Sequence, residues 1–294
     1  LRGSAVLVAA PVEAPGDLIM KPSAFEYIRP GSLAEALDCL KRHGEDARII
    51  AGGLSLVPEM NFRLVQPKVL LDIADLKELD TVRLDTDHIE VGATATQARL
   101  LAWPQLASAS PLLAQALPHV GHFQTRSRGT VCGSIANSDP SSELPLCLAT
   151  LGGSVILRSK AASREVAAAN FQLGLLQTAR KPDEMVVAVR FPLRQKGAGY
   201  AFHEMARRRG DLAICAVAAK VTERSVRLGV GGIADKPTVR DWNDLADSGL
   251  DDALNELAWD LEASDDIHGT AVYRRQLVRR LGRRAILEAR ECRN

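Results

Sequence analysis

Apolar and polar positions in the first 75 residues follow first a helical and then an extended period. From Leu33 to Leu40, apolar residues recur three or four positions apart, which places them on one face of a helix. Ser32 and Glu35 form a capping box at the start of this helix, and Gly44 suits its C-terminal end. Short strands are predicted next, at 48–51 and 68–73. The pattern predicts a small α/β unit.

A second unit is predicted from the pattern between residues 76 and 192. Its extended segments alternate apolar and polar side chains, whereas its helical segments repeat every three or four residues. Strands are predicted at 88–93, 154–157 and 184–192, and helices at 97–106, 111–117 and 144–151. A run of hydroxyl-bearing and glycine residues, 130–143, interrupts the regular pattern and is predicted to be a loop that follows a strand.

The last third of the chain reads as several strands followed by helices. A polar, basic and glycine-bearing linker is predicted at 193–198. Strands are predicted at 199–205, 212–221 and 225–231, with a helix at 273–281. This order is typical of an α+β domain. We therefore divide the chain into a leader or expression-tag segment at 1–19, two units at 20–75 and 76–192, and a C-terminal α+β domain at 199–290.

The N-terminal segment and the overall hydropathy argue against a membrane span. Ala5 to Ala10 is apolar but far shorter than the roughly 18 residues a spanning helix requires, and no other apolar run reaches that length. Leu1 to Ser4 resembles a tag remnant, and Met20 resembles a natural start. We expect residues 1–19 to lie outside the fold.

Composition excludes several classes of function. The net charge is +1 and aromatic residues make up 4%, so neither a polyanion-binding surface nor a base-stacking platform is indicated. The five cysteines are widely scattered without a CxxC pair, so a metal centre or iron–sulfur cluster in this chain is not supported. Their scatter favours reduced thiols and a cytoplasmic protein. No GxSxG motif is present, which argues against a serine hydrolase.

Two small, glycine-bearing segments carry the candidate chemistry. The first runs from Ile50 to Leu56 (IAGGLSL) and the second from Thr130 to Glu143 (TVCGSIANSDPSSE). Glycine allows close approach of the backbone, and hydroxyls and free N–H groups donate hydrogen bonds to a pyrophosphate. Asp139 and Glu143 are candidate acceptors for ribose hydroxyls or for a flavin ring. Together the two segments predict a dinucleotide site without a GxGxxG motif.

Each segment also has a purely structural interpretation. Gly52-Gly53 is a common sequence for a tight turn. Likewise, the stretch from Asp139 to Glu143, with Pro140, is compatible with an ordinary helix start. The combination of the two segments in one chain favours the binding interpretation over either structural one.

The order of three motifs resembles a known family. AGG-x-S, TVCGSIANSDPSSELP and the later RR-x-GDLA together resemble the FAD-binding medium subunit of the molybdenum hydroxylases, over about Met20 to Leu287. The resemblance implies a two-part FAD-binding domain of the vanillyl-alcohol-oxidase (PCMH) type, followed by a smaller α+β domain. It also implies that this chain is one subunit of a heterotrimer, together with a large molybdopterin-binding subunit and a small [2Fe–2S] subunit, and that two heterotrimers associate as a dimer.

The resemblance also implies which residues contact FAD. The first segment is expected to bind the pyrophosphate, the second to approach the pyrophosphate and flavin, and Glu143 to contact the adenosine ribose. His203 occupies a position where related proteins often carry a lysine near the flavin. The expected cofactor residues are Ile50, Ala51, Gly52, Gly53, Leu54, Ser55, Leu56, Val120, Thr130, Val131, Cys132, Gly133, Ser134, Ser138, Asp139, Glu143, Met185, Val186 and His203.

Cys132 departs from the family pattern, because the family has a glycine at this position. Its Cβ and sulfur are expected to stand where the backbone passes closest to the cofactor, so that the loop shifts or the thiol touches the flavin. The resemblance implies an electron-transfer subunit that carries electrons from [2Fe–2S] clusters through FAD to an external acceptor, with no catalytic side chain required. Two alternatives stay open: a stand-alone flavin oxidoreductase of the same fold, and a scaffold subunit that has lost FAD.

Overall fold

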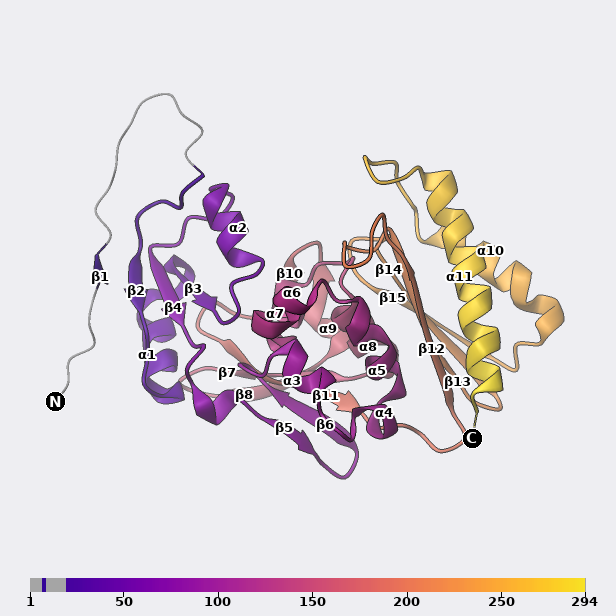
Figure 1. The fold of residues 1–294 in the computed structure, drawn as a ribbon, viewed down its shortest axis with the longest axis horizontal. Helices are drawn as coiled ribbons and strands as arrows, with labels where there is room; N and C mark the ends of the chain where they lie inside the picture. The colour runs from indigo at the N-terminus through magenta and orange to yellow at the C-terminus, as the bar shows by residue number, and fades with distance from the viewer. Residues whose placement is uncertain (1–6, 9–19, 294) are drawn as a thin grey trace.

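The computed structural model describes Leu7, Val8 and residues 20–293, which form three units arranged in a row (Figure 1). In the first unit the strands lie in the order β1 (Leu7–Val8), β2 (Glu26–Ile28), β4 (Val69–Asp72) and β3 (Ala47–Ile50). β2, β4 and β3 are parallel, and β1 is an antiparallel edge strand. Leu7–Val8 thus joins a sheet, whereas the rest of the expected leader lies outside the described residues.

Helix α1 (Leu33–His43) connects β2 to β3 and packs its apolar side chains on the sheet. Ser32 Oγ accepts a hydrogen bond from Glu35 N, as a capping box requires, but the Glu35 carboxylate accepts from Gly31 N at 2.7 Å. Gly44 ends the helix with φ +50°, a backbone conformation that glycine adopts without strain. Short helical segments follow at η1 (Gly44–Asp46), α2 (Leu56–Asn61) and η2 (Lys77–Leu79).

The middle unit is a five-stranded antiparallel sheet covered by short helices. The strands lie in the order β5 (Val82–Leu84), β6 (His88–Gly92), β11 (Met185–Pro192), β7 (Ser154–Arg158) and β8 (Ser163–Ala167). A two-stranded ribbon consists of β9 (Gln172–Gly174) and β10 (Gln177–Thr178). The helices are α3 (Gln97–Leu101), α4 (Leu106–Ala109), α5 (Pro111–Ala116), η3 (Leu117–His119), α6 (Phe123–Arg128), α7 (Val131–Asn137), α8 (Glu143–Leu151) and α9 (Ala168–Phe171).

The C-terminal unit is an antiparallel meander with helices on its outer face. Its elements are β12 (Gly199–Met205), β13 (Cys215–Val221), β14 (Ser225–Gly231), β15 (Thr238–Asn243), η4 (Asp247–Gly249), α10 (Leu250–Asp260) and α11 (Ala271–Glu291). Alternation along β13 gives this sheet two apolar faces: Ala216 and Ala218 belong to the core shared with the middle unit, whereas Val217 and Ala219 pack toward α10 and α11.

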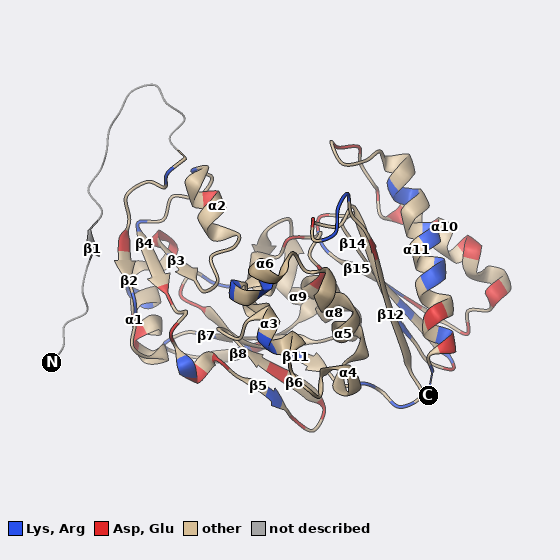
Figure 2. Ribbon diagram, in the orientation of Figure 1, with Lys and Arg blue, Asp and Glu red and all other residues tan. Residues whose placement is uncertain are grey.

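Opposite charges line the outer helix pair. Figure 2 shows basic residues along α11 and acidic residues along α10. Arg283 contacts Asp251 at 2.9 Å, and the Arg275 guanidinium lies 4.2 Å from the ring centroid of Trp259. Exposed pairs of this kind contribute little individually, so the buried apolar residues between the helices and the sheet hold this unit together.

Several elements differ from the sequence-based prediction. The helix expected at 97–106 ends at Leu101, because Pro104 follows closely and disfavours helix at the preceding residue. The strand expected at 212–221 begins only at Cys215, and residues 206–214 form the loop that precedes it. The strands β8 and β15 and the helix α10 were not predicted. Within the described part of the chain, no helix combines the length and apolarity needed to cross a lipid bilayer.

Candidate functional site

A cavity of about 610 Å³ lies where the three units meet. Its walls come from β3 and α2 in the first unit, from α7 and β11 in the middle unit, and from a loop of the C-terminal unit at 210–212. A pocket of this volume is in the range that holds a small molecule or cofactor. Both glycine-bearing segments identified from the sequence reach this cavity.

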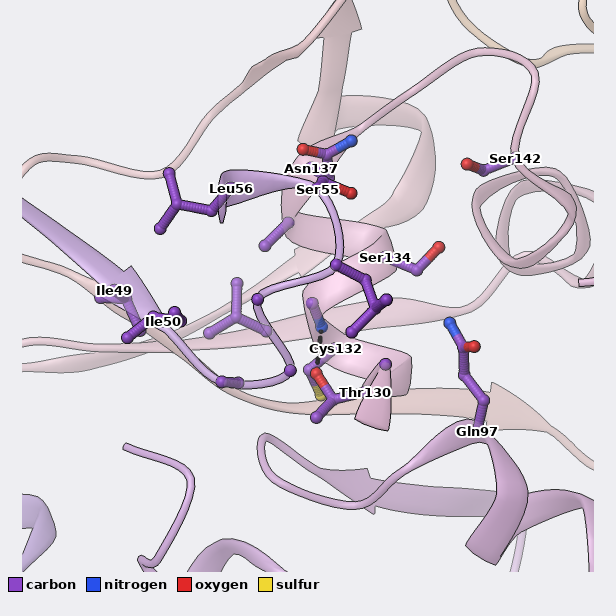
Figure 3. Close-up of a pocket in the computed structure, with 18 of the residues that line it drawn as sticks. Ile49, Ile50, Ser55, Leu56, Gln97, Thr130, Cys132, Ser134, Asn137 and Ser142 are labelled. Carbon is purple, nitrogen blue, oxygen red and sulfur yellow. Dashed lines mark hydrogen bonds between the residues drawn. The ribbon is translucent and has the colours of Figure 1, made fainter. Parts of the chain in front are cut away.

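The first wall is the loop that follows β3. Ala51, Gly52, Gly53, Leu54 and Ser55 all line the cavity, and β3 fixes where the loop begins. None of their five backbone N–H groups donates a hydrogen bond to another described residue. These residues are half-buried or exposed, so their N–H groups are open to solvent at the cavity and are free to donate to an anionic ligand. Figure 3 shows this loop passing beside α7.

Gly52 packs against Arg128 and Gly129, the two residues that precede the second segment. A Cβ atom at this position would lie 2.3 Å from the Arg128 carbonyl oxygen and 2.9 Å from Gly129 Cα, so only glycine fits there. Gly53 has φ +76°, where side chains are strained. The turn interpretation of this glycine pair is confirmed at Gly53, and Gly52 permits the close packing against residues 128–129. The binding interpretation stays a prediction.

The second segment is a helix, so the prediction of a loop after a strand was wrong for residues 131–137. Thr130 is the N-cap of α7, and its Oγ1 accepts a hydrogen bond from Gly133 N at 2.9 Å. Capping by threonine satisfies a donor of the first turn and offsets the low helix propensity of Gly133. Thr130 also forms an isolated β-bridge with Thr96, which positions the start of α7.

Cys132 borders the cavity, but its thiol is engaged with the backbone of β6. Its side chain is 2% exposed, and Sγ lies 3.3 Å from the Val91 carbonyl oxygen, on the core side of α7. The helical geometry of α7 directs this thiol toward β6, which argues against the predicted contact between the thiol and the flavin. Burial raises the pKa of the Cys132 thiol well above its ordinary value, so the group stays protonated and inert.

Glu143 is a buried carboxyl at the cavity wall. It is 4% exposed, begins α8, and makes no side-chain hydrogen bond to another described residue. Burial, helped by the nearby Glu204 carboxylate, raises the pKa of Glu143 to about 7. His119 Nδ1 lies 3.0 Å from Glu204 Oε1 behind it, and this hydrogen bond raises the pKa of His119. Glu143 is therefore placed to form a hydrogen bond with a ligand.

The structure brings together most of the residues predicted from the sequence. Those lining the cavity are Ile50, Ala51, Gly52, Gly53, Leu54, Ser55, Leu56, Val120, Thr130, Cys132, Gly133, Ser134, Glu143, Met185 and Val186. Four others do not line it. Val131 and Ser138 are buried, Asp139 Oδ1 accepts from Ser141 N at 2.8 Å, and His203 Nε2 lies 2.8 Å from Glu288 Oε2 on α11.

Sequence reasoning missed several lining residues. Arg48, Arg180 and Gln97 line the cavity, as does the 210–212 loop. Arg180 Nη1 donates to the carbonyl oxygens of Lys181 and Glu184, and burial lowers the pKa of its guanidinium. The 210–212 loop belongs to the RR-x-GDLA motif, which carried the family resemblance but was not assigned to the site. No sequence motif marks Arg48, Gln97 or Arg180.

The site defines a class of ligand. The unengaged N–H groups of Ala51 to Ser55 suit a phosphate group. The hydroxyl of Ser134 on α7 and the buried carboxyl of Glu143 also border the cavity. The cavity is shared by three units, and these features fit a dinucleotide such as FAD. The chain is a cofactor-binding α+β protein.

Comparisons with known proteins agree with this class. Residues 23–194 match the family described as the FAD-binding domain in molybdopterin dehydrogenase, and residues 200–289 match the CO dehydrogenase flavoprotein C-terminal domain. The chain belongs to this family, as an FAD-binding medium subunit of the molybdenum hydroxylase group of oxidoreductases.

Individual relatives cover nearly the whole chain. The nicotine 6-hydroxylase medium subunit of Paenarthrobacter nicotinovorans is 36% identical, covering 92% of this chain and 99% of the relative. The carbon monoxide dehydrogenase medium chain of Afipia carboxidovorans is 33% identical, covering 92% and 98%. A solved structure of reconstituted CO dehydrogenase from Oligotropha carboxidovorans superposes with a TM-score of 0.88 at 32% identity, covering 92% and 99%. The predicted two-part FAD-binding fold with a smaller C-terminal domain is confirmed.

Proposed function

We propose that this subunit receives electrons from [2Fe–2S] clusters of a small partner subunit and passes them through FAD to an external acceptor. FAD supplies the redox chemistry when bound, and the chain binds, orients and shields it. The observation that carries the proposal is the run of five unengaged backbone N–H groups, Ala51 to Ser55, at the cavity. No protein acid or base is required for electron transfer.

Each wall of the cavity then has a role. The N–H groups of Ala51 to Ser55 hold the pyrophosphate, and Thr130 and Ser134 border the same cavity. Glu143 forms a hydrogen bond with a sugar hydroxyl. Apolar side chains from β11 exclude water from the cofactor. In these assignments the residues of the cavity bind FAD, and none of their side chains takes part in a reaction.

We also propose the assembly and the division of the chain. The named relatives are medium subunits, which supports partners consisting of a large molybdopterin-binding subunit and a small [2Fe–2S] subunit. The proposed assembly is a cytoplasmic dimer of heterotrimers. Residues 20–75 and 76–192 form the two FAD-binding parts, and 199–290 the C-terminal domain. Residues 1–19 are proposed as a leader or tag, of which Leu7–Val8 pairs with β2.

The test is a comparison between the isolated chain and the assembled complex. Both are loaded with FAD and followed by absorbance at about 450 nm, where oxidised flavin absorbs. We expect the substrate of the complex to bleach the flavin only when the partner subunits are present, with molybdenum and iron found in the complex by metal analysis. Bleaching of the isolated chain by a small organic substrate would instead establish a stand-alone oxidoreductase.

A further inference from the structure

Two arginines line the cavity and have no carboxylate partner. Arg48 belongs to β3, and Arg180 belongs to the loop between β10 and β11. Neither guanidinium forms an ion pair with another described residue, and the carboxylate of Glu184 is held by Arg164 at 2.7 Å instead. Arg180 is half-buried, and cations removed from water are normally paired. The unpaired guanidinium therefore indicates a ligand that supplies the missing partner.

Contacts with its own loop fix the Arg180 guanidinium. Its Nη1 donates to the carbonyl oxygens of Lys181, Pro182 and Glu184 at 3.0, 3.4 and 2.8 Å. A guanidinium has five N–H donors and no acceptor, so Nε and Nη2 keep donors that no other described residue engages. Neither of these two atoms is fully enclosed by the protein. Arg180 thus offers oriented donors that suit only an electron-rich or anionic group.

The charges around this guanidinium leave the wall positive. Burial lowers the pKa of the Arg180 guanidinium, and the neighbouring charge of Arg48 lowers it further. Glu184 and Asp183 raise this pKa, but by less. Glu59 of α2 also lines the cavity near Arg48, and burial raises the pKa of its carboxyl. Two arginines and one glutamate on the cavity wall carry a net positive charge, which attracts an anion.

The Arg48 guanidinium lies away from the N–H groups that suit a pyrophosphate. Arg48 precedes Ala51, the first residue of that loop, by three positions on an extended strand, a distance of about 10 Å at roughly 3.3 Å per residue. Its Nη1 points back toward the start of β3, where it donates to the carbonyl oxygens of Glu45 and Ala47 at 3.3 and 3.4 Å. The arginines therefore serve a part of the ligand other than the pyrophosphate.

The apolar residues that follow each arginine suit a flat ring. Ile49 and Ile50 follow Arg48 on β3, and Met185 and Val186 begin β11 after the second loop; these apolar residues all line the cavity. Apolar walls with a few placed polar groups are the usual surroundings of a cofactor ring. The isoalloxazine ring of FAD combines an apolar ring face with two carbonyl oxygens that accept hydrogen bonds, which are the groups that free guanidinium donors require.

We propose that Arg180, assisted by Arg48, donates hydrogen bonds to the pyrimidine carbonyls of the flavin ring and thereby raises the flavin reduction potential. This rests on the proposed FAD site. The oxidised ring is neutral, and uptake of two electrons from the partner subunit and one proton from solvent converts it to an anion. A fixed cation stabilises the anion more than the neutral ring, so it favours reduction.

The full-length chain with Arg180→Met tests the proposal. The reduction potential of bound FAD is measured by dye-coupled titration, and the affinity for oxidised FAD by flavin fluorescence. We expect the ratio of the affinity for reduced FAD to that for oxidised FAD to fall about tenfold, which lowers the potential of a two-electron couple by about 30 mV. Arg180→Lys keeps the charge and should retain most of the wild-type potential. Arg48→Met, at an exposed position, should lower the potential by less.

Arg164→Met is the matched control, because it removes the same charge and disturbs the same loop. Arg164 Nη2 donates to the Ala179 carbonyl oxygen at 2.6 Å, and its Nε donates to Glu184 Oε1 at 2.7 Å, but Arg164 does not line the cavity. This variant should lower the unfolding midpoint and shift the potential much less than Arg180→Met does. An equal shift in the two variants would overturn the proposal.

Two further results would contradict the assignment to the flavin ring. One is an unchanged potential in both Arg180→Met and Arg48→Met with FAD bound. The other is an equal loss of affinity for oxidised and reduced FAD in Arg180→Met, which would place the guanidinium at the pyrophosphate, whose charge does not change on reduction. A wild-type chain that binds no FAD would instead refute the proposed function.

Discussion

Gly52 and Arg128 meet through their backbones: a Cβ atom on residue 52 would lie 2.3 Å from the Arg128 carbonyl oxygen. Residue 52 follows β3 in the first unit, whereas residue 128 ends α6 in the middle unit. The first glycine-bearing segment therefore packs directly against the residues that immediately precede the second one. Cofactor affinity depends on this contact as well as on contacts to the cofactor itself.

Gly52→Ala is expected to separate the two segments. A Cβ at 2.3 Å from a backbone oxygen cannot be accommodated by a side-chain rotation, so the loop must move. We expect FAD affinity to fall at least about a hundredfold, because the N–H groups of Ala51 to Ser55 are displaced together. The measurement is FAD bound per purified chain, from flavin absorbance against protein concentration.

Gly249→Ala is the control for that variant. At this position, in the C-terminal unit, the nearest atom to an added Cβ lies 3.7 Å away, an ordinary contact. We expect full FAD occupancy in this variant. If Gly52→Ala retained full occupancy as well, the packing account of residue 52 would be refuted.

Glu143 makes the stability of the FAD-free chain depend on pH. Burial raises the pKa of this carboxyl to about 7 from its ordinary 4.5, so the folded chain binds a proton that the unfolded chain has released. The free energy of unfolding should therefore fall by about 3 kcal/mol as pH rises from about 4.5 to 7, and then level off. Denaturant unfolding between pH 5 and 8 measures this decline.

The Glu143→Gln variant has no carboxyl to ionise, so its free energy of unfolding should fall much less as pH rises. At pH 8 the variant should be more stable than wild type. The part that remains comes from other groups, including His119, whose pKa the Glu204 carboxylate raises and whose stabilising charge is likewise lost as pH rises. An unchanged pH profile in Glu143→Gln would show that the Glu143 carboxyl is solvated.

Cys132→Gly should affect stability and leave the flavin unaffected. The thiol packs in the core and contacts the Val91 carbonyl oxygen, away from the cofactor wall. Glycine removes buried volume and lowers helix propensity, so we expect a loss of about 1–3 kcal/mol in the free energy of unfolding. The flavin reduction potential, measured by dye-coupled titration, should not change. A shifted potential at unchanged FAD affinity would place the thiol at the flavin.

Thiol labelling tests the burial of the cysteines more broadly. Cys39, Cys132, Cys147 and Cys215 are buried, and burial raises the pKa of each thiol, whereas Cys292 is exposed. Only Cys292 should react with iodoacetamide in the native chain, giving one modified residue by mass spectrometry. All five should react after denaturation. Native labelling at Cys132 would mean that α7 opens.

The sequence predicted local features better than long-range ones. The Ser32 cap, the helix stop at Gly44 and the loop after β3 depend on neighbouring residues and were predicted, whereas the Glu35 carboxylate bonds Gly31 N and not Ser32 N. α7 was not, because its glycine and hydroxyl content resembles a loop and only the Thr130 cap reveals a helix. The orientation of Cys132 follows from that helix. Gln97 approaches the site through Gly129, a contact that no local pattern encodes.

Titration of the isolated full-length chain with FAD tests the central claim most directly. The account predicts one FAD per chain, displaced in part by ADP, because the pyrophosphate occupies the N–H groups of Ala51 to Ser55. A correctly folded chain that binds no FAD, or one whose FAD binding is unaffected by Gly52→Ala, would contradict it.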